Sequence, residues 1–148
     1  MIVSPALPMN AASTSQRVLL IEDDENSRRT LRMVLEEEGF VVQVAADGQE
    51  GVELVPSFCP DVVILDLALP RLNGFDAADA LKQNTSTSGI PLVAVTASWL
   101  GSESALLREF GFVTALRKPI AAERLVEELR KILPGQSGDA FPLLVPSP

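Results

Sequence analysis

The sequence contains no histidine and only one cysteine, Cys59, among its 148 residues. The absence of histidine excludes histidine acid–base catalysis, histidine-based catalytic triads and histidine-containing zinc sites. A single cysteine cannot form an internal disulfide, which favours a reducing compartment, and we expect Cys59 to be a buried, inert thiol. No segment approaches the roughly 18 apolar residues of a membrane span, and the first basic residue of the chain is Arg17, so no secretory signal is evident. These absences predict a cytoplasmic protein without a membrane partner.

Basic residues are also scarce. Twelve Lys and Arg stand against 20 Asp and Glu, which gives a formal net charge of -8. Binding to a nucleic-acid backbone requires clustered basic side chains, so we expect no direct binding to DNA. Hydrophobic residues make up 47% of the chain, as in ordinary globular proteins, and 148 residues allow one domain with a substantial core.

The composition divides the chain into three parts. Residues 1–16 lack hydrophobic periodicity and are predicted to be a flexible N-terminal tail, and residues 134–148 are predicted to be a Pro/Gly-rich C-terminal tail. Within the second tail, residues 141–146 (FPLLVP) are too short and too rich in proline to span a membrane. For these residues we favour a disordered apolar tail over a docking motif. Residues 17–133 are predicted to form the single folded domain.

Inside this domain, short apolar runs alternate with stretches of helical spacing. The runs predict strands at 18–21, 41–46, 62–65, 92–95 and 113–117. Helices are expected to end at Gly39, before Pro56, near Gln83, near Gly111 and after Leu133. Five strand–helix units predict an α/β fold with a doubly wound, five-stranded parallel sheet of order 2-1-3-4-5, in which the three most apolar strands are central.

In such a sheet, polar residues that follow the strands meet at its carboxyl edge, where ligands bind. These residues are Glu22, Asp23, Asp24, Asp66, Thr96 and Lys118. Two carboxylates about 5 Å apart repel by roughly 3 kcal/mol at an effective dielectric of about 20, so the cluster needs compensation. A divalent cation would provide it, and oxygen-only ligands suit Mg²⁺, although a lysine alone could offset part of the repulsion. Asp24 also fits the N-cap of the following helix.

Four motifs at these strand ends resemble those of one family. Residues 18–24 (VLLIEDD), 60–70 (PDVVILDLALP, with Asn73 and Gly74 after it), 95–97 (VTA) and 117–119 (RKP) occur in the order found in receiver domains of two-component response regulators. The similarity covers residues 17–133. The chain resembles stand-alone receivers of the chemotaxis-regulator type, which have a flavodoxin-like fold.

The resemblance implies a role for each motif position. Asp66 would accept a phosphoryl group, and Mg²⁺ would be held by Asp23, Asp66, the backbone carbonyl of Ala68 and, through water, Glu22. Lys118 would contact the phosphoryl oxygens. The peptide bond between Lys118 and Pro119 would be cis. Thr96 would turn its hydroxyl toward the phosphoryl group. Ala97, a small residue, would leave room for the donor.

The implied donor is a phosphohistidine on a sensor histidine kinase or histidine phosphotransfer protein, which must act in trans because this chain has no histidine. The output would be contact with a downstream protein target. The protein would then be a phosphoacceptor and not an enzyme, apart from slow self-phosphorylation and self-dephosphorylation.

One position departs from the family. Receivers of this type usually carry Tyr or Phe three residues before the lysine, whereas this chain has Ala115. We therefore expect a smaller conformational shift, or one carried by the loop after Thr96, where Trp99 would report it.

Three alternative functions compete with this interpretation. Aspartate-nucleophile phosphohydrolases commonly place a second Asp two residues after the nucleophile, where this chain has Ala68. A nucleotide- or flavin-binding protein is disfavoured because the sequence lacks both the P-loop pattern and the dinucleotide glycine pattern. Residues 84–89 (NTSTSG) look like a phosphate loop, but they precede the fourth strand and so lie at the edge opposite the acids. A receiver-fold module that binds partners without phosphorylation stays open.

Overall fold

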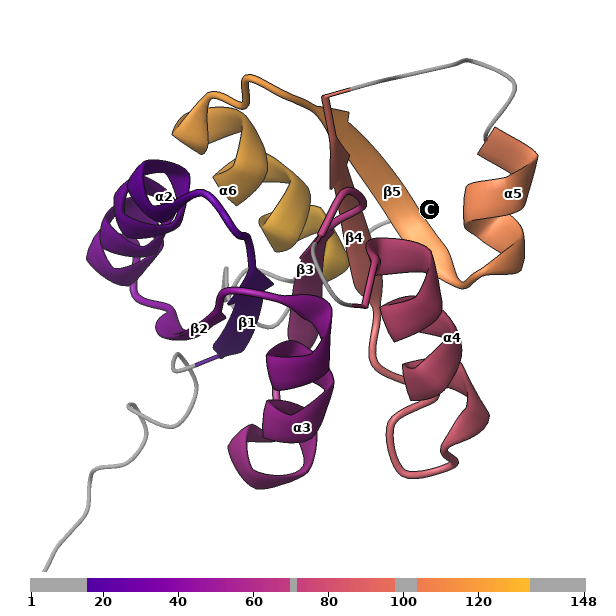
Figure 1. Cartoon of the computed structure of the whole chain (residues 1–148). Helices are drawn as coiled ribbons and strands as arrows, with labels where there is room; N and C mark the ends of the chain where they lie inside the picture. The colour runs from indigo at the N-terminus through magenta and orange to yellow at the C-terminus, as the bar shows by residue number, and fades with distance from the viewer. Residues whose placement is uncertain (1–15, 70–71, 98–103, 134–148) are drawn as a thin grey trace, which may run out of the picture.

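The computed structural model describes residues 16–69, 72–97 and 104–133. They form five strands and five helices in alternation (Figure 1). The strands are β1 (Arg17–Ile21), β2 (Val41–Ala45), β3 (Val62–Asp66), β4 (Leu92–Thr96) and β5 (Phe112–Arg117). The helices are α2 (Glu25–Glu37), α3 (Gly48–Phe58), α4 (Gly74–Gln83), α5 (Ser104–Glu109) and α6 (Ala122–Ile132).

All strands pair in parallel, in the order β2-β1-β3-β4-β5. The predicted fold class and strand order are therefore confirmed. The central strands β3 and β4 are buried along their whole length, and β1 is buried from Val18 onward, because helices cover both faces. The edge strands β2 and β5 alternate between buried and more exposed residues.

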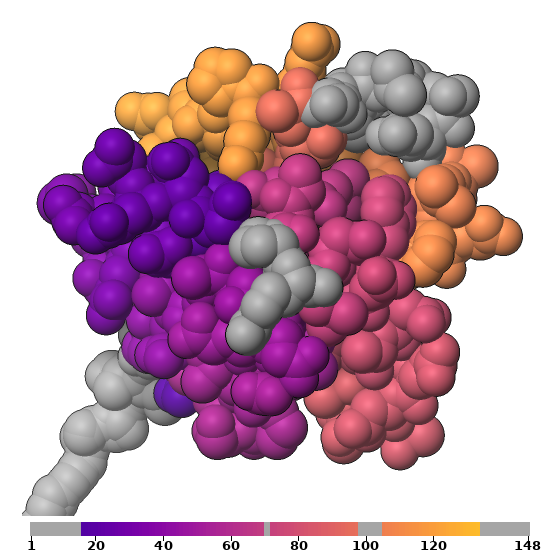
Figure 2. Space-filling model, in the orientation of Figure 1, coloured from indigo at the N-terminus to yellow at the C-terminus, as the bar shows by residue number. Residues whose placement is uncertain are grey.

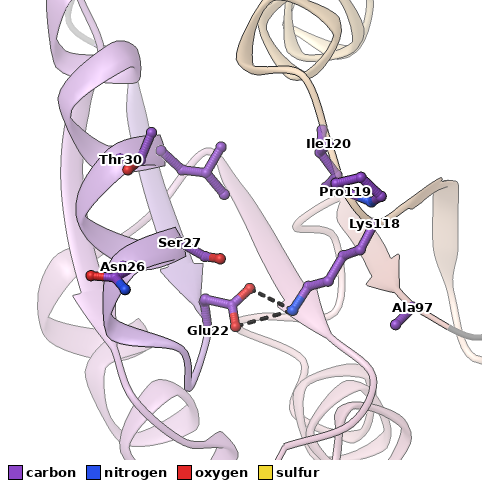
Figure 3. A pocket seen from close by; sticks show the side chains of 9 residues that line it. Glu22, Asn26, Ser27, Thr30, Ala97, Lys118, Pro119 and Ile120 are labelled. Atoms are coloured by element: carbon purple, nitrogen blue, oxygen red, sulfur yellow. Dashed lines mark hydrogen bonds and ion pairs between the residues drawn. The ribbon is translucent and has the colours of Figure 1, made fainter.

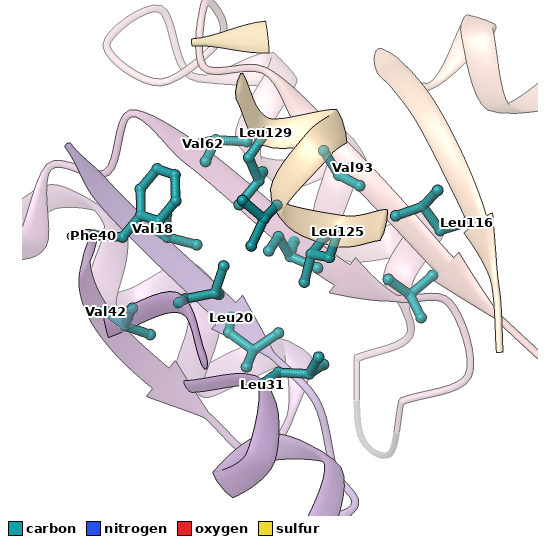
Figure 4. Packing of buried hydrophobic residues seen from close by; sticks show 14 of the residues in the cluster. Val18, Leu20, Leu31, Phe40, Val42, Val62, Val93, Leu116, Leu125 and Leu129 are labelled. Atoms are coloured by element: carbon teal, nitrogen blue, oxygen red, sulfur yellow. The ribbon is translucent and has the colours of Figure 1, made fainter. Parts of the chain in front are cut away.

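Two hydrophobic layers hold the helices against the sheet. On one face, Leu31 and Leu35 of α2 and Leu125 and Leu129 of α6 pack against strand residues such as Leu20 (Figure 4). On the other face, α3, α4 and α5 cover the alternate strand residues, which include Leu19, Ile21 and Leu65. Helices α3 and α4 lie side by side in the ribbon and space-filling views (Figures 1 and 2). Among the described residues, none of the helices has the length and hydropathy needed to cross a membrane.

Two local predictions were wrong. Helix α3 continues through Pro56 to Phe58, because the preceding Val55 is buried against the sheet and this packing outweighs the cost of the proline. Cys59 is exposed and not buried, because it caps α3 in the left-handed conformation (φ 54°), at a surface turn. The end of α2 matches the prediction, and Gly39 follows it with φ 101°.

Candidate functional site

The carboxyl ends of four strands bring the sequence-predicted residues to one edge of the sheet. Glu22 and Asp23 follow β1, Asp66 ends β3, Thr96 ends β4, and Lys118 follows β5. Asp66 is paired in register with Val95, the residue before Thr96. The backbone N–H of Lys118 donates to the carbonyl of Thr96 at 2.8 Å, which fixes the start of the β5–α6 connection.

Asp66 is a buried carboxylate with a defined donor for each oxygen. Its Oδ1 accepts a hydrogen bond from the backbone N–H of Ala68 at 3.0 Å. Its Oδ2 accepts from Nζ of Lys118 at 2.8 Å. A carboxylate that ends a fully buried strand is costly unless it has such charged or hydrogen-bonding partners. Lys118 therefore orients Asp66 and compensates part of its charge.

Lys118 also contacts Glu22, which is 2% exposed. Its Nζ lies 2.9 Å from Oε1 and 3.1 Å from Oε2 of Glu22 (Figure 3). Burial raises the pKa of the Glu22 carboxyl, although hydrogen bonds from Asp24 and Lys118 partly oppose this effect. Burial alone would lower the pKa of Lys118, but its contacts with Asp66 and Glu22 outweigh burial and raise it. The sequence did not predict the contact between Lys118 and Glu22.

Three carboxylates of the site lie close enough to share one cation. One oxygen from each of Glu22, Asp23 and Asp66 lies within 4.8 Å of the others. Asp23 is exposed, whereas the other two are buried, so the cluster opens to solvent on one side. An all-oxygen donor set with an open side fits Mg²⁺, which binds through few carboxylates and keeps several waters. Lys118 compensates only part of the negative charge of this cluster.

The connection from β1 to α2 is fixed by its own polar groups. Oδ2 of Asp24 accepts from the backbone N–H of Ser27 at 2.8 Å, so the predicted N-cap role of Asp24 is confirmed. This hydrogen bond lowers the pKa of the Asp24 carboxyl. The Arg28 guanidinium donates to the carbonyl of Glu22 at 2.9 Å. Sequence reasoning missed Arg28, because nothing in its spacing shows that its side chain folds back over the connection.

The connection from β3 to α4 approaches Asp66 closely. Asn73 caps α4 by accepting from the N–H of Asp76 at 2.9 Å, and the N–H of Gly74 donates to the carbonyl of Leu67 at 3.1 Å. A Cβ at Gly74 would lie 2.7 Å from the backbone oxygen of Asp66. The glycine therefore allows α4 to start directly against the end of β3.

A cavity of about 510 Å³ opens beside the acidic cluster. Ala97, Lys118, Pro119 and Ile120 line it on the β4–β5 side, and the peptide bond between Lys118 and Pro119 is cis, as predicted. Asn26, Ser27 and Thr30 of α2 line the opposite side (Figure 3). No role was predicted for these three residues, although they follow the acidic pair Glu22 and Asp23 by one and two helical turns.

The other residues that the sequence singled out lie away from the acidic cluster or outside the described residues. Ala115 is half-buried on β5, and its register partner is Ala94. Residues 84–89 precede β4, at the edge opposite the acids, as predicted. Two of them, Ser86 and Thr87, line a cavity together with Pro56 and Cys59. Trp99 and both tails, apart from Gln16, lie outside the described residues.

Comparisons with known proteins relate the chain to response regulators. Residues 18–130 match the model of the response regulator receiver domain. The chain is 33% identical to protein PilH of Pseudomonas aeruginosa, over 80% of this chain and 98% of PilH. It is 34% identical to the response regulator MprA of Mycolicibacterium vanbaalenii, but over 79% of this chain and only 50% of MprA. The chain thus spans about half the length of MprA and nearly all of PilH.

Solved structures show the same fold. A putative response regulator from Chloroflexus aurantiacus is 28% identical, with a TM-score of 0.76 over 82% of this chain and 99% of that one. The receiver domain of the sensor histidine kinase PA1611 from Pseudomonas aeruginosa is 25% identical, with a TM-score of 0.74 over 82% and 99% of the two chains. In that structure a magnesium ion is coordinated in the active-site cleft. The protein described here belongs to the family of response regulator receiver domains.

Proposed function

We propose that this receiver domain accepts a phosphoryl group on Asp66 from a phosphohistidine donor and signals by protein–protein contact. The observation that carries the proposal is the environment of Asp66. This buried carboxylate has Lys118 on one oxygen, at 2.8 Å, and lies within a cluster of three acids that is open to solvent. Phosphoryl transfer depends mainly on positioning and on neutralising spread negative charge, and these groups supply both.

The chain's own residues would act in defined ways. An Asp66 oxygen forms the new bond to phosphorus while the phosphorus–nitrogen bond of the donor breaks, and the departing imidazole takes up a proton. Lys118 moves from carboxylate to phosphoryl oxygens, and Thr96 turns its hydroxyl toward them. Ala97, which is exposed at the cavity, leaves room for the donor.

The residues that would hold Mg²⁺ are Asp23 and Asp66 directly, Glu22 through water, and the backbone carbonyl of Ala68. The donor set supports this assignment, because three carboxylate oxygens converge within 4.8 Å. A bound Mg²⁺ would neutralise the charge that gathers on the phosphoryl oxygens during transfer. Glu22 would remain in contact with Lys118 and limit how far the lysine can move.

The proposed partners are a histidine kinase or histidine phosphotransfer protein as donor, and a protein target downstream. The cavity between α2 and the β5–α6 connection gives the donor access to the site. A formal net charge of -8 disfavours direct DNA binding by this chain. We place the domain, residues 17–133, in the cytoplasm, where such donors are found, and treat residues 1–16 and 134–148 as its tails.

The second candidate is a receiver-fold module that binds partners without phosphorylation, and Ala115 in place of the switch aromatic is the feature that favours it. A phosphohydrolase is disfavoured because Ala68 offers no carboxylate to activate water. The backbone N–H of Ala68 instead donates a hydrogen bond to Asp66. An acyl phosphate on Asp66 should therefore persist longer than an enzyme intermediate would.

Incubation with acetyl phosphate and Mg²⁺, followed by intact-mass measurement, tests the proposal. The wild type should gain one acid-labile phosphoryl group, and Asp66→Asn should gain none. Asp76→Asn serves as the matched control, because Asp76 is an exposed acid on α4 outside the cluster. Equal labelling of wild type and Asp66→Asn would refute the assignment, and absence of labelling in both would favour the phosphorylation-independent module.

A further inference from the structure

A groove of about 360 Å³ lies beside the edge strand β5 and the first turn of α6. Its lining is apolar apart from two arginines, and it includes Ala115, Leu116 and Ala121. Pro119 and Ile120 line both this groove and the cavity at the acidic site. The groove is therefore separate from the proposed phosphorylation site but shares a wall with it.

The charges of the groove contrast with those of the whole chain. Arg117 and Arg124 are exposed, and no acidic residue lines the groove among the described residues. Arg117 has no ion-pair partner in the described part of the chain, and Arg124 has only Glu128, at 3.3 Å. The first turn of α6 also lacks a side-chain N-cap. In a chain with net charge -8, the groove fits an occupant that combines a carboxylate with apolar side chains.

The chain itself contains such a segment. Among residues 134–148 the one charged side chain is that of Asp139, and the apolar stretch 141–146 begins two residues later, after Ala140. Helix α6 is followed by Leu133, and the 12 steps from Ala121 to Leu133 correspond to about 18 Å of helix. Six further residues in extended conformation span about 20 Å, so Asp139 can return to the level of the groove.

We propose that residues 139–146, for which the sequence alone favours a disordered tail, dock in this groove of the same molecule. Asp139 pairs with Arg117 and Arg124, and the apolar side chains of the segment cover Pro119 and Ile120. The docked segment lies against the Pro119–Ile120 wall, next to Lys118. This contact goes beyond the proposed phosphorylation and does not depend on it.

Paramagnetic relaxation measured by NMR on the full, unphosphorylated chain tests the contact. A nitroxide is attached at Ala140→Cys in a Cys59→Ser background, because Cys59 is exposed and would also be labelled. The amide signals of Arg117, Ile120 and Arg124 should lose intensity severalfold relative to the reduced label. Signals of β2, at the other edge of the sheet, should not change. The amide spectrum itself reports whether each variant is folded.

Asp139→Lys in the same labelled chain is the matched control and should abolish most of the broadening. Broadening that is absent, uniform over the surface, or unchanged by Asp139→Lys would overturn the proposal. A mixed sample tests whether the groove instead binds the segment of a second copy. It combines chains that carry the nitroxide but no ¹⁵N with ¹⁵N-labelled chains that carry no nitroxide. Groove broadening in that mixture, at the level seen within one chain, would mean that the segment docks on a second copy and would also overturn it.

Discussion

Nζ of Lys118 lies 2.8 Å from Oδ2 of Asp66, although the two residues are 52 positions apart in the chain. Their strands are not neighbours, because β4 lies between β3 and β5. The lysine side chain therefore crosses the end of β4 to reach both Asp66 and Glu22. This pair links the centre of the sheet to its edge. Removal of the lysine should therefore change both the free energy of unfolding and the extent to which Mg²⁺ raises it.

Lys118→Met keeps the length of the side chain but removes the cation from two buried carboxylates. We expect the free energy of unfolding in EDTA to fall by about 1–3 kcal/mol, because buried groups lose their partner. Mg²⁺ should restore part of the loss. Urea unfolding followed by circular dichroism measures both effects. Lys131→Met, at an exposed lysine that contacts Glu128 at 3.4 Å, should change little. Equal losses in the two variants would contradict the special role of Lys118.

Asp23→Asn and Asp24→Asn distinguish a metal ligand from a helix cap. Asp23 belongs to the carboxylate cluster, whereas Asp24 is committed to the N–H of Ser27. We expect Asp23→Asn to weaken Mg²⁺ binding by at least about tenfold, as loss of a ligand should cost no less than loss of a group that supports one. Asp24→Asn should leave the affinity nearly unchanged, since Asn also caps helices. Calorimetric titration with Mg²⁺ measures this, and a larger effect at Asp24 would exclude the proposed ligand set.

Gly74→Ala tests the close approach of α4 to the end of β3. The added Cβ would lie 2.7 Å from the oxygen of Asp66 and from Cα of Leu67, both backbone atoms. We expect a loss of about 1–3 kcal/mol in stability from this overpacking, together with slower phosphorylation of the displaced Asp66. Gly89→Ala is the control, because no atom lies within 4 Å of its added Cβ. Thermal unfolding of both variants measures the loss. A Gly74→Ala variant as stable as the wild type would show that α4 can shift without loss of stability.

Thr96→Val probes the conformational response to phosphorylation. Thr96 is buried at the end of β4, and Trp99 follows three residues later, outside the described residues. We expect acetyl phosphate with Mg²⁺ to change Trp99 emission in the wild type, and Thr96→Val to reduce the change, because its side chain cannot donate a hydrogen bond to the phosphoryl group. If emission stays constant while mass spectrometry shows phosphorylation, the response does not pass through the loop after Thr96.

The strand order could be predicted because β1, β3 and β4 are continuous apolar runs that only central strands require. The meeting of Glu22, Asp66 and Lys118 at one edge followed from the same topology. What the sequence did not show was which oxygen each side chain would contact. The double contact of Lys118 with Glu22 and the return of Arg28 to the carbonyl of Glu22 depend on side-chain rotamers, which leave no periodic signal.

The errors at Pro56 and Cys59 have a local cause. A proline inside a helix removes one backbone hydrogen bond and crowds the turn that precedes it, and tertiary packing can override this cost. Val55, one residue earlier, is 1% exposed and anchors α3 to the sheet, so the helix continues past it. The burial of Cys59 was inferred from its residue type, whereas the backbone conformation at the end of α3 determined its exposure.

The position of β3 and β5 in the sheet gives the two halves of the site different mechanical freedom. Asp66 is on a strand with hydrogen-bonded neighbours on both sides, and Lys118 follows a strand that, within the described part of the chain, is bonded on one side only. A displacement of Asp66 would strain two ladders, whereas a displacement of Lys118 strains one. Any change that loosens the contact between them is therefore absorbed on the β5 side, which carries the Pro119–Ile120 wall and both arginines of the groove.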